Sequence, residues 1–161
     1  MIRETTQAVD IVWATTPEDM DVARGLFREY AASLNVDLCF ENLDKELERL
    51  PGEYAPPDGR LLFAMVDKNI EGCVALKKAG DHLCEMKRLF VRPAFHGMGI
   101  GKRLVLTLMD EARAAGYRRL RLDTLPSMQE AIRLYRRLGF AEIHPFRPVP
   151  VPGTLYMEIK L

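Results

Sequence analysis

A glycine-rich turn is the part of this sequence whose residue types and spacing most clearly suggest chemistry. Gly97, Gly99 and Gly101 come directly before an apolar stripe with helical spacing. The first N–H groups of a helix lack intrahelical partners and carry a partial positive charge, so they bind phosphate readily. Glycine removes the Cβ that would hold a phosphate away from those amides, and Lys102 adds a cation. The turn therefore predicts an anion site, although an ordinary strand-to-helix turn would use the same glycines.

Spacing excludes two well-known nucleotide-binding loops at this turn. A P-loop has the form GxxxxGK followed by Ser or Thr, but Gly97 and Gly101 are one residue too close and Arg103 occupies the hydroxyl position. The dinucleotide fingerprint GxGxxG would need a glycine at Lys102 or Leu104, depending on the starting glycine, and an early βαβ unit before it. A phosphate site here must therefore be of a different kind.

The segments on either side of the turn indicate which elements position it. Residues 61–66, 70–77 and 83–91 are strand-like and are separated by short polar turns, which predicts an antiparallel meander. The last strand ends at Pro93, and the apolar helical stripe after the glycines continues to Gly116. The turn is therefore expected to join a strand to a long helix.

The remaining segments are short and regular enough to complete one domain over residues 1–161. They are a strand at 11–14, a helix after the capping residue Thr16, a helix at 41–50, a strand at 118–124, a helix from a capping box at Ser127 to Gly139, and strands at 140–143 and 155–161. The chain has 161 residues, of which 48% are hydrophobic, which is enough for a single core.

Composition limits the classes of partner. Lys plus Arg and Asp plus Glu both total 23, so the net charge is zero and gives no overall attraction to nucleic acid or membranes. The apolar runs are too short to span a bilayer, and residues 1–10 do not resemble a signal peptide, so a cytoplasmic protein is expected. Cys39, Cys73 and Cys84 fit buried reduced thiols, and the three histidines have no metal-binding spacing, so no metal is expected.

Two motifs resemble those of the GNAT family of N-acetyltransferases. Residues 85–104 are similar to its acetyl-CoA-binding motif, in which Arg or Gln, two residues, Gly, one residue and Gly or Ala follow a strand ending in Val-x-Pro; His96 replaces the Arg or Gln. Residues 131–140 are similar to the family signature AxxLYxxxGF. The resemblance extends over residues 61–143, while the first two helices and the tail agree mainly in the order of their elements.

The resemblance implies a fold and an activity. The fold is α/β (α+β): a single domain with a mixed, mostly antiparallel twisted sheet of about six to seven strands, flanked by helices and with a splayed central cleft for acyl-CoA. The activity is direct transfer of acetyl from acetyl-CoA to a primary amine of a small molecule or peptide. The cofactor-binding residues would be the backbone of Leu89, Phe90 and Val91 for pantetheine, and the turn His96, Gly97, Met98, Gly99, Ile100, Gly101 and Lys102 for pyrophosphate.

The resemblance also implies two catalytic residues. Tyr135 would protonate the departing thiolate, since a phenol with a pKa of about 10, above the thiol's of about 8.5, is normally protonated and has a proton to donate. A core tyrosine would show the same helical spacing. Glu85 would take a proton from the amine, directly or through water, although a glutamate at the end of a strand is usually only solvated.

Several alternatives stay open at this point. The same fold could use a longer acyl donor, or the chain could be a CoA-binding sensor without catalysis. The acids Asp37, Glu41, Asp44 and Glu48 could attract a cationic amine or form a solvated helix face, and Phe40 and the loop 144–152 could complete the acceptor pocket. An arginine cluster between residues 118 and 137 fits a solvated surface better than nucleic-acid binding. A homodimer, which is common in the family, is a further open alternative.

Overall fold

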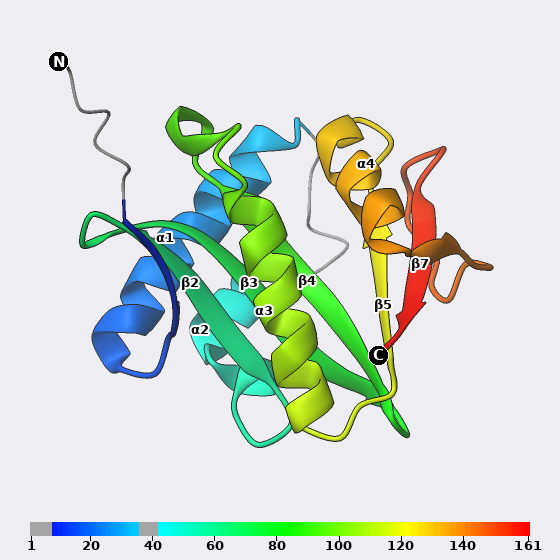
Figure 1. Ribbon diagram of the computed structural model, residues 1–161, viewed down its shortest axis with the longest axis horizontal. Coiled ribbons are helices and arrows are strands. Elements are labelled where there is room, and N and C mark those ends of the chain that lie inside the picture. Colours follow the sequence, from blue (N-terminus) through cyan, green and yellow to red (C-terminus); the bar gives the residue numbers. More distant parts are fainter. Residues whose placement is uncertain (1–7, 36–41) are drawn as a thin grey trace, which may run out of the picture.

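The computed structural model describes residues 8–35 and 42–161, which form one sheet flanked by helices (Figure 1). The strands are β1 Val9–Trp13, β2 Arg60–Val66, β3 Asn69–Gly80, β4 Leu83–Val91, β5 Arg119–Thr124, β6 Ala141–Glu142 and β7 Leu155–Lys160. The helices are α1 Pro17–Ser33, α2 Leu43–Arg49, α3 Ile100–Ala114 and α4 Gln129–Leu138, with short 3₁₀ turns η2 Gly52–Tyr54 and η3 Pro93–Phe95. In the sheet the order is β1-β2-β3-β4-β5-β7-β6.

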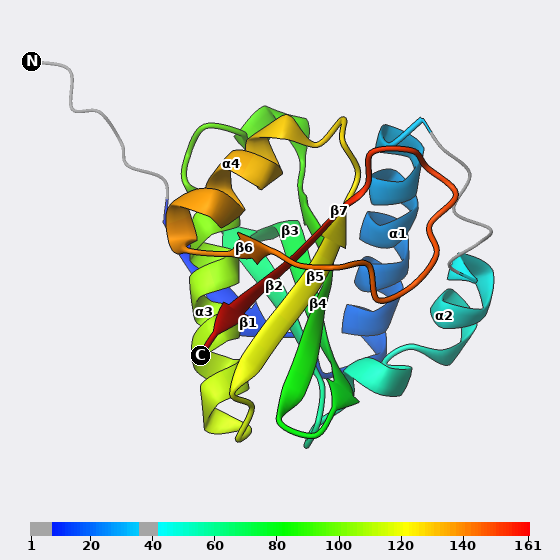
Figure 2. The same ribbon diagram turned by 90° about the vertical axis from the view of Figure 1, so that its right-hand side faces the viewer.

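Both faces of this sheet are apolar and each carries its own pair of helices. Along β2, Leu62 and Ala64 belong to the core under α3 and α4, while Leu61 and Phe63 belong to the core under α1 and α2. Successive side chains of a strand point to opposite faces, so a run of apolar residues serves both cores. Figure 2 shows α3 and α4 on one side of the sheet and α1 and α2 on the other. The meander predicted from the sequence is confirmed.

Local capping signals were informative at one helix and misleading at another. Thr16 caps α1: its Oγ1 accepts from the Asp19 N–H at 3.0 Å, and the Asp19 carboxylate accepts from the Thr16 N–H at 3.1 Å. The capping box predicted at Ser127 is wrong, because Met128 is the N-cap of α4 and makes no side-chain capping bond. Gly139 ends α4 in the left-handed conformation, as its position predicted.

A fork between β4 and β5 is the feature of the sheet that creates a site. These parallel strands pair at only three positions, the last joining Glu85 to Arg121. Beyond it, β4 has an extra residue opposite β3, between Lys87 and Phe90, and Arg88 there has φ +61. A bulge of this kind bends a strand away from its neighbour. The splayed cleft predicted with the GNAT fold is thus present.

Gly72 on β3 should be required for the bulge. A Cβ on this residue would stand 2.9 Å from the Phe90 carbonyl oxygen, which is backbone and cannot rotate away. We expect Gly72→Ala to lower the free energy of unfolding by about 1–3 kcal/mol because of this overpacking. Gly25→Ala is the control, since nothing lies within 4 Å of its Cβ position in α1. Urea unfolding of both variants measures the difference, and equal stability would contradict the assignment.

Candidate active site

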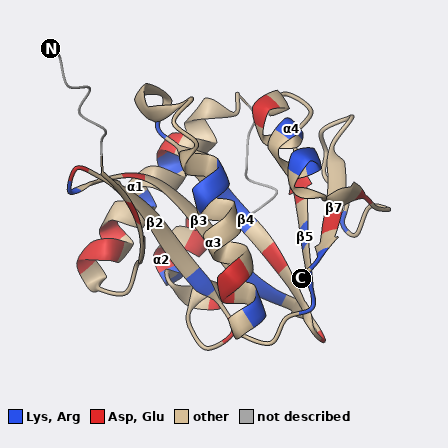
Figure 3. Cartoon of the chain, viewed as in Figure 1, with Lys and Arg blue, Asp and Glu red and all other residues tan. Residues whose placement is uncertain are grey.

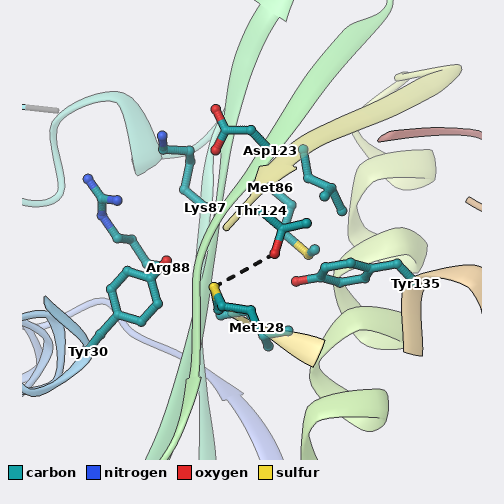
Figure 4. Close-up of a pocket in the computed structure, with 10 residues that line it drawn as sticks. Tyr30, Met86, Lys87, Arg88, Asp123, Thr124, Met128 and Tyr135 are labelled. Atoms are coloured by element: carbon teal, nitrogen blue, oxygen red, sulfur yellow. Dashed lines mark hydrogen bonds between the residues drawn. The ribbon is translucent and has the colours of Figure 1, made fainter. Parts of the chain in front are cut away.

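The fork holds a small cavity that reaches between the two strands. Its volume is about 30 Å³, and it is lined by Tyr30, Met86, Lys87, Arg88, Leu89, Leu122, Asp123, Thr124, Met128 and Tyr135. Residues of β4 and β5 therefore form its walls, and α1 and α4 contribute the remainder. At its rim the Thr124 hydroxyl donates to the Met128 sulfur at 3.7 Å (Figure 4). The space is narrow but polar groups surround it.

Tyr135 contributes a ring to the core and a hydroxyl to this cavity. The residue is only 4% exposed, and its ring packs against Phe140 with centroids 5.5 Å apart. Figure 4 shows its hydroxyl directed toward Thr124 and Met128. Burial, with smaller effects from Tyr30 and Asp123, raises the pKa of Tyr135 well above its usual value. The phenol therefore stays protonated at physiological pH and is available as a proton donor.

The edge of β4 past the fork offers backbone groups to a ligand. The Phe90 carbonyl is directed at β3, where it lies 2.9 Å from the Cβ position of Gly72. Backbone groups alternate in direction along a strand, so those of Leu89 and Val91 face the opposite edge. Among the described residues β5 pairs with β4 no further than Arg121, so this edge is not covered by the neighbouring strand. Of the three predicted pantetheine contacts, Leu89 and Val91 have the favourable orientation.

The glycine turn lies between this strand and α3. Gly97 and Gly99 have φ +83 and +74, and no atom lies within 4 Å of a Cβ built on either. Glycine is therefore required at these two positions by the backbone angle and not by packing. Gly99 is the N-cap of α3 and makes no side-chain cap, while Met98 is 41% exposed. Ile100 is 1% exposed, so it could offer a ligand only its backbone.

His96 has a structural contact that the sequence did not indicate. Its Nε2 lies 2.7 Å from the carbonyl oxygen of Val91. A carbonyl only accepts, so Nε2 must carry the proton and donate. The imidazole thereby fastens the start of the turn to the end of β4. In the same region Arg103 donates from Nη1 to the Val9 carbonyl at 2.6 Å, and Lys102 beside it is also exposed.

Glu85 is fully buried at the last rung of the fork and is surrounded by cations. Its Oε1 accepts from Arg121 Nε at 3.0 Å and from Arg147 Nη2 at 2.7 Å. Its Oε2 has no hydrogen bond among the described residues and lies 3.9 Å from Lys87 Nζ. Burial alone would raise the pKa of Glu85, but Lys87, Arg147 and Lys77 outweigh it, so that pKa lies below its usual value. The side chain is a buried carboxylate and not a neutral acid.

A second, larger cavity adjoins the fork on the face covered by α2. Its volume is about 750 Å³, and it is lined by Asn42, Lys45, Glu46, Arg49, Pro51, Gly52, Glu53, Tyr54, Lys77, Lys87, Arg88, Arg147 and Pro148. Lys87 and Arg88 line both cavities, so the two are neighbours across β4. A volume of this size is typical of small-molecule sites.

The larger cavity changes the interpretation of the acidic second helix. Asp44 and Glu48 are exposed and do not line it, so they fit the solvated helix face that the sequence left open. Asp37, Phe40 and Glu41 lie outside the described residues, as does Cys39. The loop after β6 does complete the cavity, through Arg147 and Pro148. Sequence reasoning missed Arg147 because nothing in its local pattern shows that it meets Glu85, 62 residues away.

Comparison with known families decides where this fold and site belong. The acetyltransferase (GNAT) family matches residues 23–140, well over half of the 161 residues. The chain belongs to the GNAT family. The matched region includes the fork, the glycine turn and Tyr135, so the resemblance drawn from two motifs is confirmed.

Relatives of this GNAT chain carry acetyltransferase names. A Schizosaccharomyces pombe protein named an uncharacterized N-acetyltransferase is 37% identical over 147 residues, which is 90% of this chain and 90% of the relative. The IAA acetyltransferase of Azospirillum brasilense is 43% identical over 110 residues, covering 66% of this chain and 71% of that protein. The GNAT chain is therefore an acetyltransferase.

Solved structures agree on the GNAT fold. The structure of yncA from Salmonella typhimurium with its cofactor acetyl-CoA has a TM-score of 0.75 and 19% sequence identity to this chain, over 95% of this chain and 94% of the other. At that identity the likeness is one of fold. The predicted GNAT architecture, with its mixed sheet and flanking helices, is confirmed.

Thiols, metals and membranes add little to the site. Cys73 and Cys84 are buried and free, and burial raises the pKa of the Cys84 thiol to about 12. Within residues 8–35 and 42–161, no group of three His, Cys, Asp or Glu side chains is placed to hold a metal ion. None of the helices in those residues is long and apolar enough to cross a membrane.

The buried carboxylate gives this GNAT protein a defined dependence of stability on pH. Because the folded-state pKa of Glu85 is lowered, its contribution is complete above the unfolded-state pKa of about 4.3 and is lost as pH falls through the folded value. We expect Glu85→Gln to cost about 2 kcal/mol of unfolding free energy at pH 7, with the difference from wild type shrinking below about pH 4.

Urea unfolding of wild type and Glu85→Gln between pH 3 and 7 measures this effect. Glu53→Gln is the control, since the Glu53 side chain is 75% exposed and lies 3.5 Å from Lys77. A gap between wild type and Glu85→Gln that grew toward low pH would contradict the assigned charge of Glu85.

Proposed function

We propose that this acetyltransferase transfers acetyl from acetyl-CoA to the primary amine of a small molecule or peptide, by direct attack while both substrates are bound. The observation that carries the proposal is the meeting of three features along β4: its uncovered edge, the glycine turn at its end and the Tyr135 hydroxyl at the fork. Bound acetyl-CoA would supply the acetyl thioester as an activated acyl group. Everything else is the work of the chain's own residues.

The residues on β4 and in the turn fit the coenzyme. The backbone of Leu89 and the N–H of Val91 face the open edge and can pair with pantetheine amides as an added strand would, while the Val91 carbonyl accepts from His96. Gly97 to Lys102 can present N–H groups to the pyrophosphate, with the partial positive charge of α3 behind them. The His96 side chain holds the start of the turn against the end of β4 through its hydrogen bond to Val91. Its proposed role is therefore to position the turn.

The narrow fork favours a short acyl group. Its cavity of about 30 Å³ is small enough to suit an acetyl group or a water molecule, and the Thr124 and Met128 side chains lie at its rim. This supports acetyl-CoA over longer donors.

Tyr135 is proposed as the general acid. Its phenol is protonated, because burial raises its pKa, and its hydroxyl opens on the fork and makes no hydrogen bond to another described side chain or backbone group. The thiolate of coenzyme A would need a proton as it leaves, and a donor held at this place supplies it without water.

Glu85 is proposed as the proton acceptor. Its lowered pKa keeps it ionised, as a base must be, but also makes it a weak one. Its Oε1 is occupied by Arg121 and Arg147, so only Oε2, beside Lys87, is available. A water between the amine and Oε2 would carry the proton from one to the other.

The cytoplasmic location and the homodimer considered from the sequence stay predictions.

Removal of the Tyr135 hydroxyl tests the proposed acid. We expect Tyr135→Phe to lower kcat about a hundredfold, with the dissociation constant of acetyl-CoA within about twofold of wild type, because a hydrogen donor is lost and the ring packing is kept. Steady-state assays of thiol release across an amine panel, with calorimetry of acetyl-CoA binding, measure both. Tyr117→Phe is the control: its hydroxyl donates to the Asp58 carbonyl at 2.7 Å, away from the fork. An unchanged kcat in Tyr135→Phe would contradict the role of Tyr135 as general acid.

Substitution in the turn tests the proposed coenzyme site. Gly99→Ala places a Cβ at φ +74, so the turn must change its angle, and we expect acetyl-CoA to bind about tenfold more weakly. Gly101→Ala should be tolerated, since its Cβ would lie 3.9 Å from Leu134 and its φ is not positive.

A further control separates binding from strain. Gly116 has φ +94 at the other end of α3, so Gly116→Ala should lose about 1–2 kcal/mol of stability with unchanged affinity. Calorimetric titration with acetyl-CoA decides; equal affinities of Gly99→Ala and wild type would place the pyrophosphate elsewhere.

A further inference from the structure

The larger cavity is lined by an excess of positive charge, although the net charge of the chain is zero. Positive and negative residues are spread over the molecule (Figure 3), and the net charge of the sequence is zero. The described lining of the cavity nevertheless has six cations and only two acids, an excess of four. The cations are Lys45, Arg49, Lys77, Lys87, Arg88 and Arg147, and the acids are Glu46 and Glu53.

The acids in and behind this lining are already engaged. Glu46 accepts from Arg88 Nε at 2.9 Å and from the Tyr54 hydroxyl at 2.7 Å. Glu53 lies 3.5 Å from Lys77 and is 75% exposed, so its charge is largely screened. Lys45 and Arg49 form no ion pair with any residue of the described ranges. Behind the lining, Glu85 and Asp123 bind Arg147, so the six cations exceed the four carboxylates by two, and this excess of positive charge faces the cavity.

Arg147 is held in place as a preorganised guanidinium. Its Nη2 donates to Glu85 at 2.7 Å, and its Nη1 donates to Asp123 at 3.0 Å. Its carbon Cζ lies 4.9 Å from the centroid of Phe146, and Arg121 packs on the same ring at 3.9 Å. The side chain is 29% exposed, so part of it is open to the cavity that it lines. A rigid guanidinium loses little entropy when it binds a carboxylate.

We propose that the acceptor is an amine that also carries a carboxylate, in the manner of a free amino acid. Resting on the proposed function, this assigns its carboxylate to Arg147 and Lys77, with Lys45 and Arg49 on α2 adding attraction at the rim. The amine then points toward the fork, because Lys87 and Arg88 line both cavities. Cationic acceptors such as polyamines and aminoglycosides are disfavoured by the same charges.

Matched acceptors test the proposal. Each of a set of amino acids is compared with its carboxamide and with its decarboxylated amine, for example phenylalanine, phenylalaninamide and phenethylamine, at fixed acetyl-CoA. We expect kcat/KM to be at least about tenfold higher for the carboxylate form. Equal or better rates with the decarboxylated amines would overturn the proposal while leaving the acetyltransferase function intact.

Variants locate the carboxylate site. Arg147→Met should raise KM for the carboxylate acceptor about tenfold or more and leave acetyl-CoA affinity unchanged. Because loss of Arg147 could disturb Glu85, the exposed double variant Lys45→Glu with Arg49→Glu is a second test and should raise the same KM. Arg113→Glu, which pairs with Asp110 on α3, is the matched control. No change in KM in either cavity variant would overturn the assignment.

Binding without turnover separates the two proposals. Calorimetry in the presence of coenzyme A measures directly the affinity of the cavity for the amino acids used as probes. Binding of amino acids through Arg147 with no acetylation of any amine would support the carboxylate site and contradict the proposed function. Acetylation only of amines that lack a carboxylate, with no binding of the amino acids, would support the proposed function and overturn the carboxylate site.

Discussion

The early end of pairing between β4 and β5 is the constraint on which the site depends. Three parallel rungs hold the strands together, and the bulge at Arg88 then turns β4 away. A residue at φ +61 is strained unless glycine occupies it, so the surrounding structure must sustain it. The resulting gap provides the open strand edge, the small cavity and the opening to the larger one. Without the fork, β4 would be an ordinary interior strand with no backbone groups to offer.

The charges around the fork show how its base is stabilised. Glu85 lies at the last paired position of β4 and β5. It accepts hydrogen bonds from Arg121 on β5 and from Arg147 in the loop after β6. A buried carboxylate is costly by itself, and these cations reverse the cost, as its lowered pKa indicates. Arg147 also donates to Asp123, so two carboxylates accompany these two cations. The network that holds the fork together therefore also fixes the Arg147 guanidinium on the wall of the adjoining cavity.

The parts of the fold that follow from local pattern could be predicted from the sequence. The bounds 83–91 of β4, the cap at Thr16 and the helix end at Gly139 depend on residues within a few positions of one another. The cap at Ser127 failed because the chain there makes its helix start at Gln129, one residue later than that box requires. The charged cavity was not predictable, since Lys45, Lys77 and Arg147 meet only through tertiary packing. The contact of His96 with Val91 likewise appears only when the turn is folded.

A crystal structure of the complex with acetyl-CoA would test the central claim most directly, which is that the fork brings the thioester to Tyr135. The account predicts pantetheine amides paired with the backbone of Leu89 and Val91, pyrophosphate at the turn from Gly97 to Lys102, and the coenzyme sulfur within hydrogen-bonding distance of the Tyr135 hydroxyl. A coenzyme bound away from β4, or a Tyr135 hydroxyl directed away from the sulfur, would contradict it.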